Sequence, residues 1–232
     1  AELALKRAVA LKPSYAWARA SLGDMLRLQG RVQEAIEQQR MALELDPLSP
    51  QSHSTLGLSL LVAGQWEEAR MQYEASAASG GETGALPTIM TSGPEMRLTG
   101  DEIAEHAVSF ARVKGASDPE AARVLGPALA DGSTDEELVE RARESVAGLI
   151  ADSVLTLQMI AGLYTKLGDH DTALDWLETL TAGGSLSAGI VGVDPALDPL
   201  RGYPRMQALM DGLGLPNGYD PEADTYEPEG TP

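Results

Sequence analysis

Cysteine is absent from the 232-residue sequence. The chain therefore forms no disulfide and offers no thiolate ligand to a metal. Aromatic residues make up only 4% of the chain, with a single phenylalanine, and Ala, Leu and Gly dominate instead. Small residues of this kind suit helices that pack closely together. The longest apolar run, around Leu56–Ala63, is too short to span a bilayer.

Basic residues are scarce after residue 80. Residues 1–80 carry 8 Lys and Arg against 9 Asp and Glu, whereas residues 81–232 carry 9 against 26, and the net charge is −18. An acidic field repels phosphate, so we expect this chain to bind neither nucleic acid nor an anionic membrane. A basic partner and plain solubility both explain the charge, and solubility is the commoner reason.

The first eighty residues repeat with a period of 34. A fixed period of this size predicts an all-α solenoid of helical hairpins, in which each repeat buries its apolar face against its neighbours. Such an array is typical of a binding surface rather than a catalyst. The residues in register are Ala1, Ala35 and Ala69; Ala8, Ala42 and Ser76; Leu22 and Leu56; Gly23 and Gly57; Leu26 and Leu60; Gly30 and Gly64; and Pro13 and Pro47.

Apolar spacing and stop signals predict helices over 1–12, 15–28, 32–45, 51–62 and 66–78. Three Ser/Thr-x-x-Glu capping boxes, Thr99–Glu102, Ser117–Glu120 and Thr134–Glu137, predict further helices over 101–114, 119–130 and 135–151. A late unit matches the first complete repeat at an offset of 138, through Ile160-Ala161, Tyr164, Gly168, Ala173 and Leu177. The predicted organisation is therefore repeats over 1–79, a hinge over 80–100, diverged helical repeats over 101–152, a late repeat with a cap over 153–215, and a disordered acidic tail over 216–232.

The segments SLGDMLRLQGRVQEAIEQQRMALELDP and TLGLSLLVAGQWEEARMQYEAS resemble tetratricopeptide repeats. The Leu-Gly pairs of helix A, the small residues Ala35 and Ala69 at the crossing of helices A and B, and the closing Ala42 and Pro47 carry the resemblance. Three positions depart from the family pattern: Arg19 and His53 replace a Trp, and Gln39 replaces an aromatic residue.

The late segment DPALDPLRGYPRMQALMDGLGLP resembles a cap that follows such arrays in bacterial multidomain signalling proteins, where the array follows a winged-helix, cyclase or kinase domain. This resemblance implies an alternative function: the segment would be the regulatory or sensory C-terminal part of a bacterial transcription regulator, adenylate cyclase or Ser/Thr kinase. The chain also begins within a repeat, so we expect the native N-terminus to lie upstream.

The resemblance implies that helix A of each repeat lines the ligand-binding groove. Trp17 is expected either to anchor a peptide there or to cover the cut edge of the array. The family's carboxylate clamp is missing its basic residues, so recognition should be hydrophobic and polar. The predicted partner-binding residues are Trp17, Asp24, Arg27, Gln51, Ser54, Leu58, Leu61, Leu155, Gln158 and Thr165.

The leading hypothesis is a protein or peptide scaffold with no enzymatic activity, no cofactor and no metal. Asp169-His170-Asp171 resembles a metal cluster, but the repeat register makes His170 a half-packed start of helix B. The glycines of 183–192 lack the Gly-Lys-Ser/Thr of a phosphate loop and form a connector. We expect a cytoplasmic location, and the sequence leaves the partner's identity and the oligomeric state open.

Overall fold

The computed structural model describes residues 2–81, 92, 96–130, 133–182, 188–215 and 217–224, and these residues contain helices and no strand. The chain divides into two compact units. Unit 1 comprises Ala1–Ala85, Gly192–Asp194 and Gly214–Pro232, and unit 2 comprises Leu86–Val191 and Pro195–Leu213. Most of the predicted hinge over 80–100 lies outside the described residues. The described residues confirm the predicted fold class, an all-α solenoid of helical hairpins.

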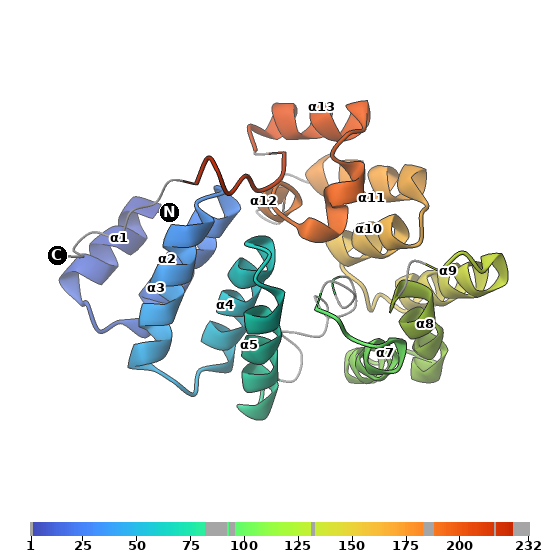
Figure 1. Ribbon diagram of the computed structural model, residues 1–232, viewed down its shortest axis with the longest axis horizontal. Helices are drawn as coiled ribbons and strands as arrows, with labels where there is room; N and C mark the ends of the chain where they lie inside the picture. The colour runs from blue at the N-terminus through green and yellow to red at the C-terminus, as the bar shows by residue number, and fades with distance from the viewer. Residues whose placement is uncertain are drawn as a thin grey trace. The chain divides into compact units, whose positions relative to one another are not determined.

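Unit 1 stacks two complete hairpins behind a single leading helix (Figure 1). Each hairpin packs helix A against its own helix B, and α3 packs on α4 to join the hairpins. The predicted bounds hold to within two residues. The helices are α1 (Glu2–Leu11), α2 (Ala16–Leu28), α3 (Val32–Leu45), α4 (Pro50–Val62) and α5 (Trp66–Ala78).

Small residues fix the crossing inside each hairpin. Ala35 and Ala69 have no solvent exposure. A Cβ added to Gly23 would lie 2.5 Å from Gln39 Cγ, and one added to Gly57 would lie 2.8 Å from the Tyr73 ring. These are equivalent pairs one repeat apart. The helices can approach only because position 23 and its repeat equivalent carry no side chain.

The two residues that replace the family's Trp make equivalent hydrogen bonds in successive repeats. Arg19 Nε donates to Pro13 O at 2.9 Å, and its Nη1 donates to Gln38 Oε1 at 3.1 Å. One repeat later, His53 Nε2 lies 3.0 Å from Pro47 O, and its Nδ1 lies 2.8 Å from Gln72 Oε1. In both repeats the side chain links the inter-repeat turn to helix B, so Arg19 and His53 have the same structural role.

The acidic tail, which the sequence predicts to be disordered, contacts the start of α3. Asp224 Oδ2 accepts a hydrogen bond from Gln33 N at 2.8 Å and one from Tyr219 OH at 3.1 Å. Gln33 Nε2 also donates to Tyr219 OH at 3.2 Å. The N-cap residue of α3, Arg31, makes no side-chain capping bond. Asp224 therefore supplies the acceptor that the helix start lacks. Residues 225–232 of the predicted tail lie outside the described residues.

Unit 2 begins with two helices that cross at small residues. Helix α7 (Gly100–Lys114) packs on α8 (Leu125–Ala130). A Cβ added to Gly126 would overlap Gly100 O and lie 2.6 Å from Ala104 Cβ. The predicted helix over 119–130 is in fact a 3-10 helix, η1 (Pro119–Val124), that continues into α8. Helix α9 (Glu136–Ala151) then packs against η1.

One of the three predicted capping boxes is confirmed and two are wrong. Thr99 and Glu102 form the full box at the start of α7. At the other two helix starts, the aspartate that follows the predicted Ser or Thr is the N-cap residue. Asp118 caps η1 and Asp135 caps α9. A carboxylate is at least as good an N-cap acceptor as a hydroxyl, which explains the shift of one residue.

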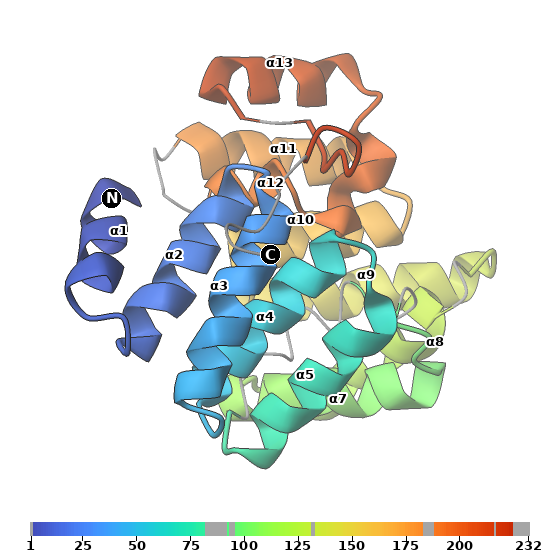
Figure 2. The same cartoon turned by 60° about the vertical axis from the view of Figure 1, so that its left-hand side comes forward.

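The late hairpin and its cap complete unit 2. Helices α10 (Leu157–Lys166) and α11 (His170–Ala182) pack together around a turn at Gly168, whose φ of +74° only glycine adopts freely. After the short α12 (Ala188–Val191) and η2 (Pro195–Leu200), α13 (Pro204–Leu213) lies on α11 (Figure 2). Met206 and Met210 are buried in α13, and Arg205 contacts Asp175 and Glu178 of α11. The predicted cap therefore covers the last hairpin.

Candidate functional site

The helix-A surface of unit 1 shows the same exposure pattern in both complete repeats. Its first position, Trp17 or Gln51, is exposed. The third position, Asp24 or Leu58, is half-buried, and the fourth, Arg27 or Leu61, is buried. The surface is thus open where α2 and α4 begin and closed toward their C-terminal ends.

Four predicted groove residues are buried and do not offer a side chain to a partner. Ser54 and Thr165 make internal hydrogen bonds, to Ser76 Oγ at 2.9 Å and to Ala161 O at 2.8 Å. Arg27 is 5% exposed to solvent and Leu61 is 2% exposed. Helix register alone could not separate these residues from their exposed neighbours, because α2 and α4 pack on each other along this face.

Trp17 is the aromatic residue of the predicted set, and it is exposed. Its side chain is 61% exposed, and its ring centroid lies 5.8 Å from that of Tyr15, which is 41% exposed. Lys12 Nζ lies 5.5 Å from the Tyr15 ring centroid, in cation–π range. Tyr15 was missed by the sequence prediction, although an aromatic residue two positions from Trp17 is a visible signal. The pair presents a large apolar surface at the start of α2.

Asp24 and Arg27 form an ion pair on the same helix face. Arg27 Nη2 lies 3.6 Å from Asp24 Oδ1, and Gln39 Nε2 donates to the same oxygen at 3.4 Å. Burial raises the pKa of Asp24, and the Arg27 guanidinium offsets only part of this shift. The Arg27 side chain is buried and engaged with Asp24, so the pair contributes to the hairpin more directly than it could bind a charged ligand.

Unit 2 contains the late residues of the predicted groove, Leu155, Gln158 and Thr165, whereas unit 1 contains the others. Leu155 and Gln158 are half-buried. His170 is the half-buried first residue of α11, as predicted, and its Nδ1 lies 2.8 Å from Tyr203 OH. Among the residues that the structure describes, no group of three His, Asp or Glu is arranged to hold a metal ion.

Comparison with known proteins agrees with the repeat register. The tetratricopeptide repeat family matches the chain over residues 1–53 and again over residues 50–75. These matches show that the first third of the chain carries tetratricopeptide repeats, which generally mediate protein–protein interaction. No curated protein matches the chain. Within the described part of the chain, no helix has the length and apolar character needed to cross a membrane.

Proposed function

We propose that this chain is a non-catalytic scaffold that binds a protein or peptide at the open end of the helix-A surface in unit 1. The observation that carries the proposal is the exposed Trp17–Tyr15 pair within a tetratricopeptide array. Exposed Trp and Tyr side chains recur as anchors in protein interfaces. Gln51, at the equivalent position of the next repeat, extends the contact with a polar group. Recognition is thus hydrophobic and polar, in a cytoplasmic setting.

The test is quantitative capture of partners by the Trp17→Ala variant and by a matched control, Met71→Ala. Met71 is 63% exposed on α5, so it resembles Trp17 in exposure but lies on helix B. A lost aromatic anchor costs about 2 kcal/mol or more, so Trp17→Ala should weaken the captured partner at least about tenfold. Met71→Ala should retain it. Equal capture by both variants would reject the assignment.

Thermal unfolding separates this proposal from the alternative that Trp17 only covers an edge of the array. If Trp17 is an anchor, its replacement leaves the unfolding temperature unchanged, because the exposed ring contributes little to packing. A lower unfolding temperature with intact binding would favour the edge explanation.

The folded cap supports a second candidate function, regulation within a bacterial multidomain signalling protein. Helix α13 covers α11, as a terminal cap should. The sequence of the gene upstream of residue 1 tests this candidate, because a winged-helix, cyclase or kinase domain is expected there.

A further inference from the structure

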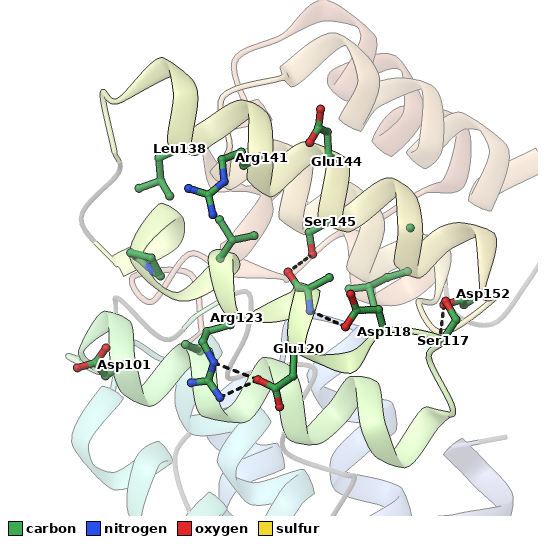
Figure 3. A pocket seen from close by; sticks show the side chains of 16 residues that line it. Asp101, Ser117, Asp118, Glu120, Arg123, Leu138, Arg141, Glu144, Ser145 and Asp152 are labelled. Carbon is green, nitrogen blue, oxygen red and sulfur yellow. Dashed lines mark hydrogen bonds and ion pairs between the residues drawn. The ribbon is translucent and has the colours of Figure 1, made fainter.

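Unit 2 contains a groove that the sequence analysis did not predict. It has a volume of about 690 Å³ and lies between α7, η1 and α9 (Figure 3). Volumes of about 300–1,000 Å³ are usual for ligand sites. One wall carries Asp118, Ala121, Val124 and Pro127. These four residues follow one another at a spacing of three. Asp118 is the N-cap of η1, Ala121 and Val124 lie within η1, and Pro127 lies in α8, which continues it.

Hydrogen bonds hold the two walls of this groove together. Ser145 Oγ on α9 donates to Ala121 O on η1 at 2.8 Å. At one end, Ser117 N and Oγ both donate to Asp152 Oδ2 at 2.8 Å. These two bonds lower the pKa of Asp152, so its carboxylate stays ionised. The groove is therefore pre-formed, which reduces the entropy cost of binding.

The groove is long and differs chemically from end to end. Its α9 wall runs from Leu138 to Asp152, a rise of roughly 20 Å along a helix. The bonds from Ser117 to Asp152 and from Ser145 to Ala121 show that the two walls run antiparallel. The later part of the first wall, with Val124 and Pro127, therefore lies toward Leu138. Asp118 and Asp152 lie together at the other end (Figure 3). A groove of this length matches a peptide segment better than a single small ligand.

Acidic groups outnumber basic ones around the groove. The carboxylates belong to Asp101, Asp118, Glu120, Glu144 and Asp152, and the guanidinium groups to Arg123 and Arg141. Arg123 already pairs with Glu105 at 2.6 Å and with Glu120 at 3.1 Å. Four carboxylates therefore remain against Arg141 alone, and the net field attracts a cation.

We propose that this groove binds a peptide segment of a partner protein that has apolar residues at one end and Arg or Lys residues at the other. The apolar residues contact Val124, Pro127 and Leu138, and the basic residues pair with Asp118 and Asp152. This inference is independent of the proposed function, because the groove lies in unit 2 and does not involve Trp17.

The probe is a fluorescein-labelled peptide with leucines at one end and arginines at the other, titrated with the full chain and followed by fluorescence anisotropy. We expect saturable binding that weakens about tenfold when the leucines become serine, and that is lost when the arginines become glutamate. Equal binding of the serine peptide or of free spermidine would overturn the proposal, because the apolar end would then contribute nothing.

Two glycine variants locate the binding. A Cβ at Gly148, which lines the groove, would meet nothing within 4 Å, and the same holds for Gly212 on α13. Gly148→Leu should fill the groove without disturbing the fold and weaken the probe about tenfold or more. Gly212→Leu and Trp17→Ala should leave probe binding unchanged. Equal affinity of the two glycine variants would overturn the assignment.

Replacing Arg141 with an acidic residue should strengthen probe binding rather than weaken it. Arg141 is exposed on α9 and makes no ion pair within the part of the chain that the structure describes. Arg141→Glu should therefore tighten the arginine probe severalfold at low salt, and the gain should shrink as salt screens it. Weaker binding of the arginine probe by Arg141→Glu would contradict the predicted polarity of the groove.

Discussion

The hairpins α2–α3 and α4–α5 make the same crossing with different side chains. In the first, Gly23 faces Gln39, and in the second, Gly57 faces Tyr73. Both large residues are buried, Gln39 at 0% exposure and Tyr73 at 2%. The amide Oε1 of Gln39 accepts no hydrogen bond in the described structure. The close approach of the two helices thus depends on a glycine in helix A. The residue of helix B that faces this glycine differs between the hairpins in chemistry and in the stability it gives.

The largest change in stability should come from replacing Tyr73, the residue that faces Gly57, with alanine. Tyr73→Ala leaves a cavity at the α4–α5 crossing and should lower the free energy of unfolding of this hairpin by about 3 kcal/mol or more. Hydrogen exchange of the α4 and α5 amides measures the loss. Met71→Ala, at an exposed position of α5, is the control and should change little. Unchanged exchange in Tyr73→Ala would mean that the ring does not fill the crossing.

Overpacking should damage both hairpins alike. Ala35→Leu and Ala69→Leu each add volume where no solvent-exposed surface remains, and each should destabilise its hairpin by about 1–3 kcal/mol. Thermal unfolding followed by circular dichroism measures the change. Ala77→Leu, on the exposed face of α5, should be neutral. If the Ala35 and Ala69 variants also melt like the parent chain, the 34-residue register is wrong.

Replacing the buried Gln39 should make the α2–α3 hairpin more stable. Gln39→Leu removes an unsatisfied buried acceptor and should stabilise α2–α3 by about 1 kcal/mol. The equivalent residue of the late hairpin, Leu177, is already a fully buried leucine, so the volume suits the crossing. Urea unfolding of the variant tests the sign, and destabilisation would show that Gln39 makes a needed hydrogen bond, such as its 3.4 Å contact with Asp24.

Exchanging the two turn-linking residues should have a smaller effect. Arg19→Ala loses three hydrogen bonds, one of them to the Met41 sulfur, and His53→Ala loses two; each variant should cost about 1 kcal/mol. The exchanges Arg19→His and His53→Arg keep a side chain that can bond the carbonyl of the turn, and they should stay within about 0.5 kcal/mol of the parent. Thermal unfolding of all four variants compares the positions. Exchanges as costly as the alanine variants would refute their equivalence.

The smallest effect on stability concerns α1, which has no buried residue. Glu2 joins it to the α2–α3 turn through Arg31 at 2.8 Å. Lys6 and Arg31 lower the pKa of Glu2 from 4.5 to about 2. Its stabilisation is therefore full above pH 4.5 and is lost as the pH falls through 2. Hydrogen exchange of α1 should differ between the parent and Glu2→Gln at pH 5, and this difference should vanish toward pH 2.

Periodicity predicted the hairpins well because their geometry depends on local spacing. Val32–Leu45 and Trp66–Ala78 match the predicted bounds, and the glycines at both turns have positive φ. The candidate site was predicted only in part. Trp17 and Gln51 are exposed, as a position on the groove requires, and their role in binding stays a prediction. It cannot predict the burial of Leu61, because burial depends on what packs against the helix from elsewhere in the chain.

Two features could not be found by local reasoning at all. The groove of unit 2 arises where η1 and α9 come together, and no motif in either segment marks it. The bond from Gln33 to Asp224 joins residues 191 positions apart. Low hydrophobicity predicts that the tail forms no core of its own. It does not reveal that a carboxylate in the tail meets an uncapped helix start.

The Asp224 contact also sets an order of events during synthesis. The ribosome completes α3 long before it reaches Asp224, and almost the whole of unit 2 is translated in between. The first hairpins can therefore assemble early through their short-range contacts, but the start of α3 acquires its acceptor only when the C-terminal segment emerges. A chain truncated before residue 224 would therefore fold its first hairpins without this bond at the start of α3.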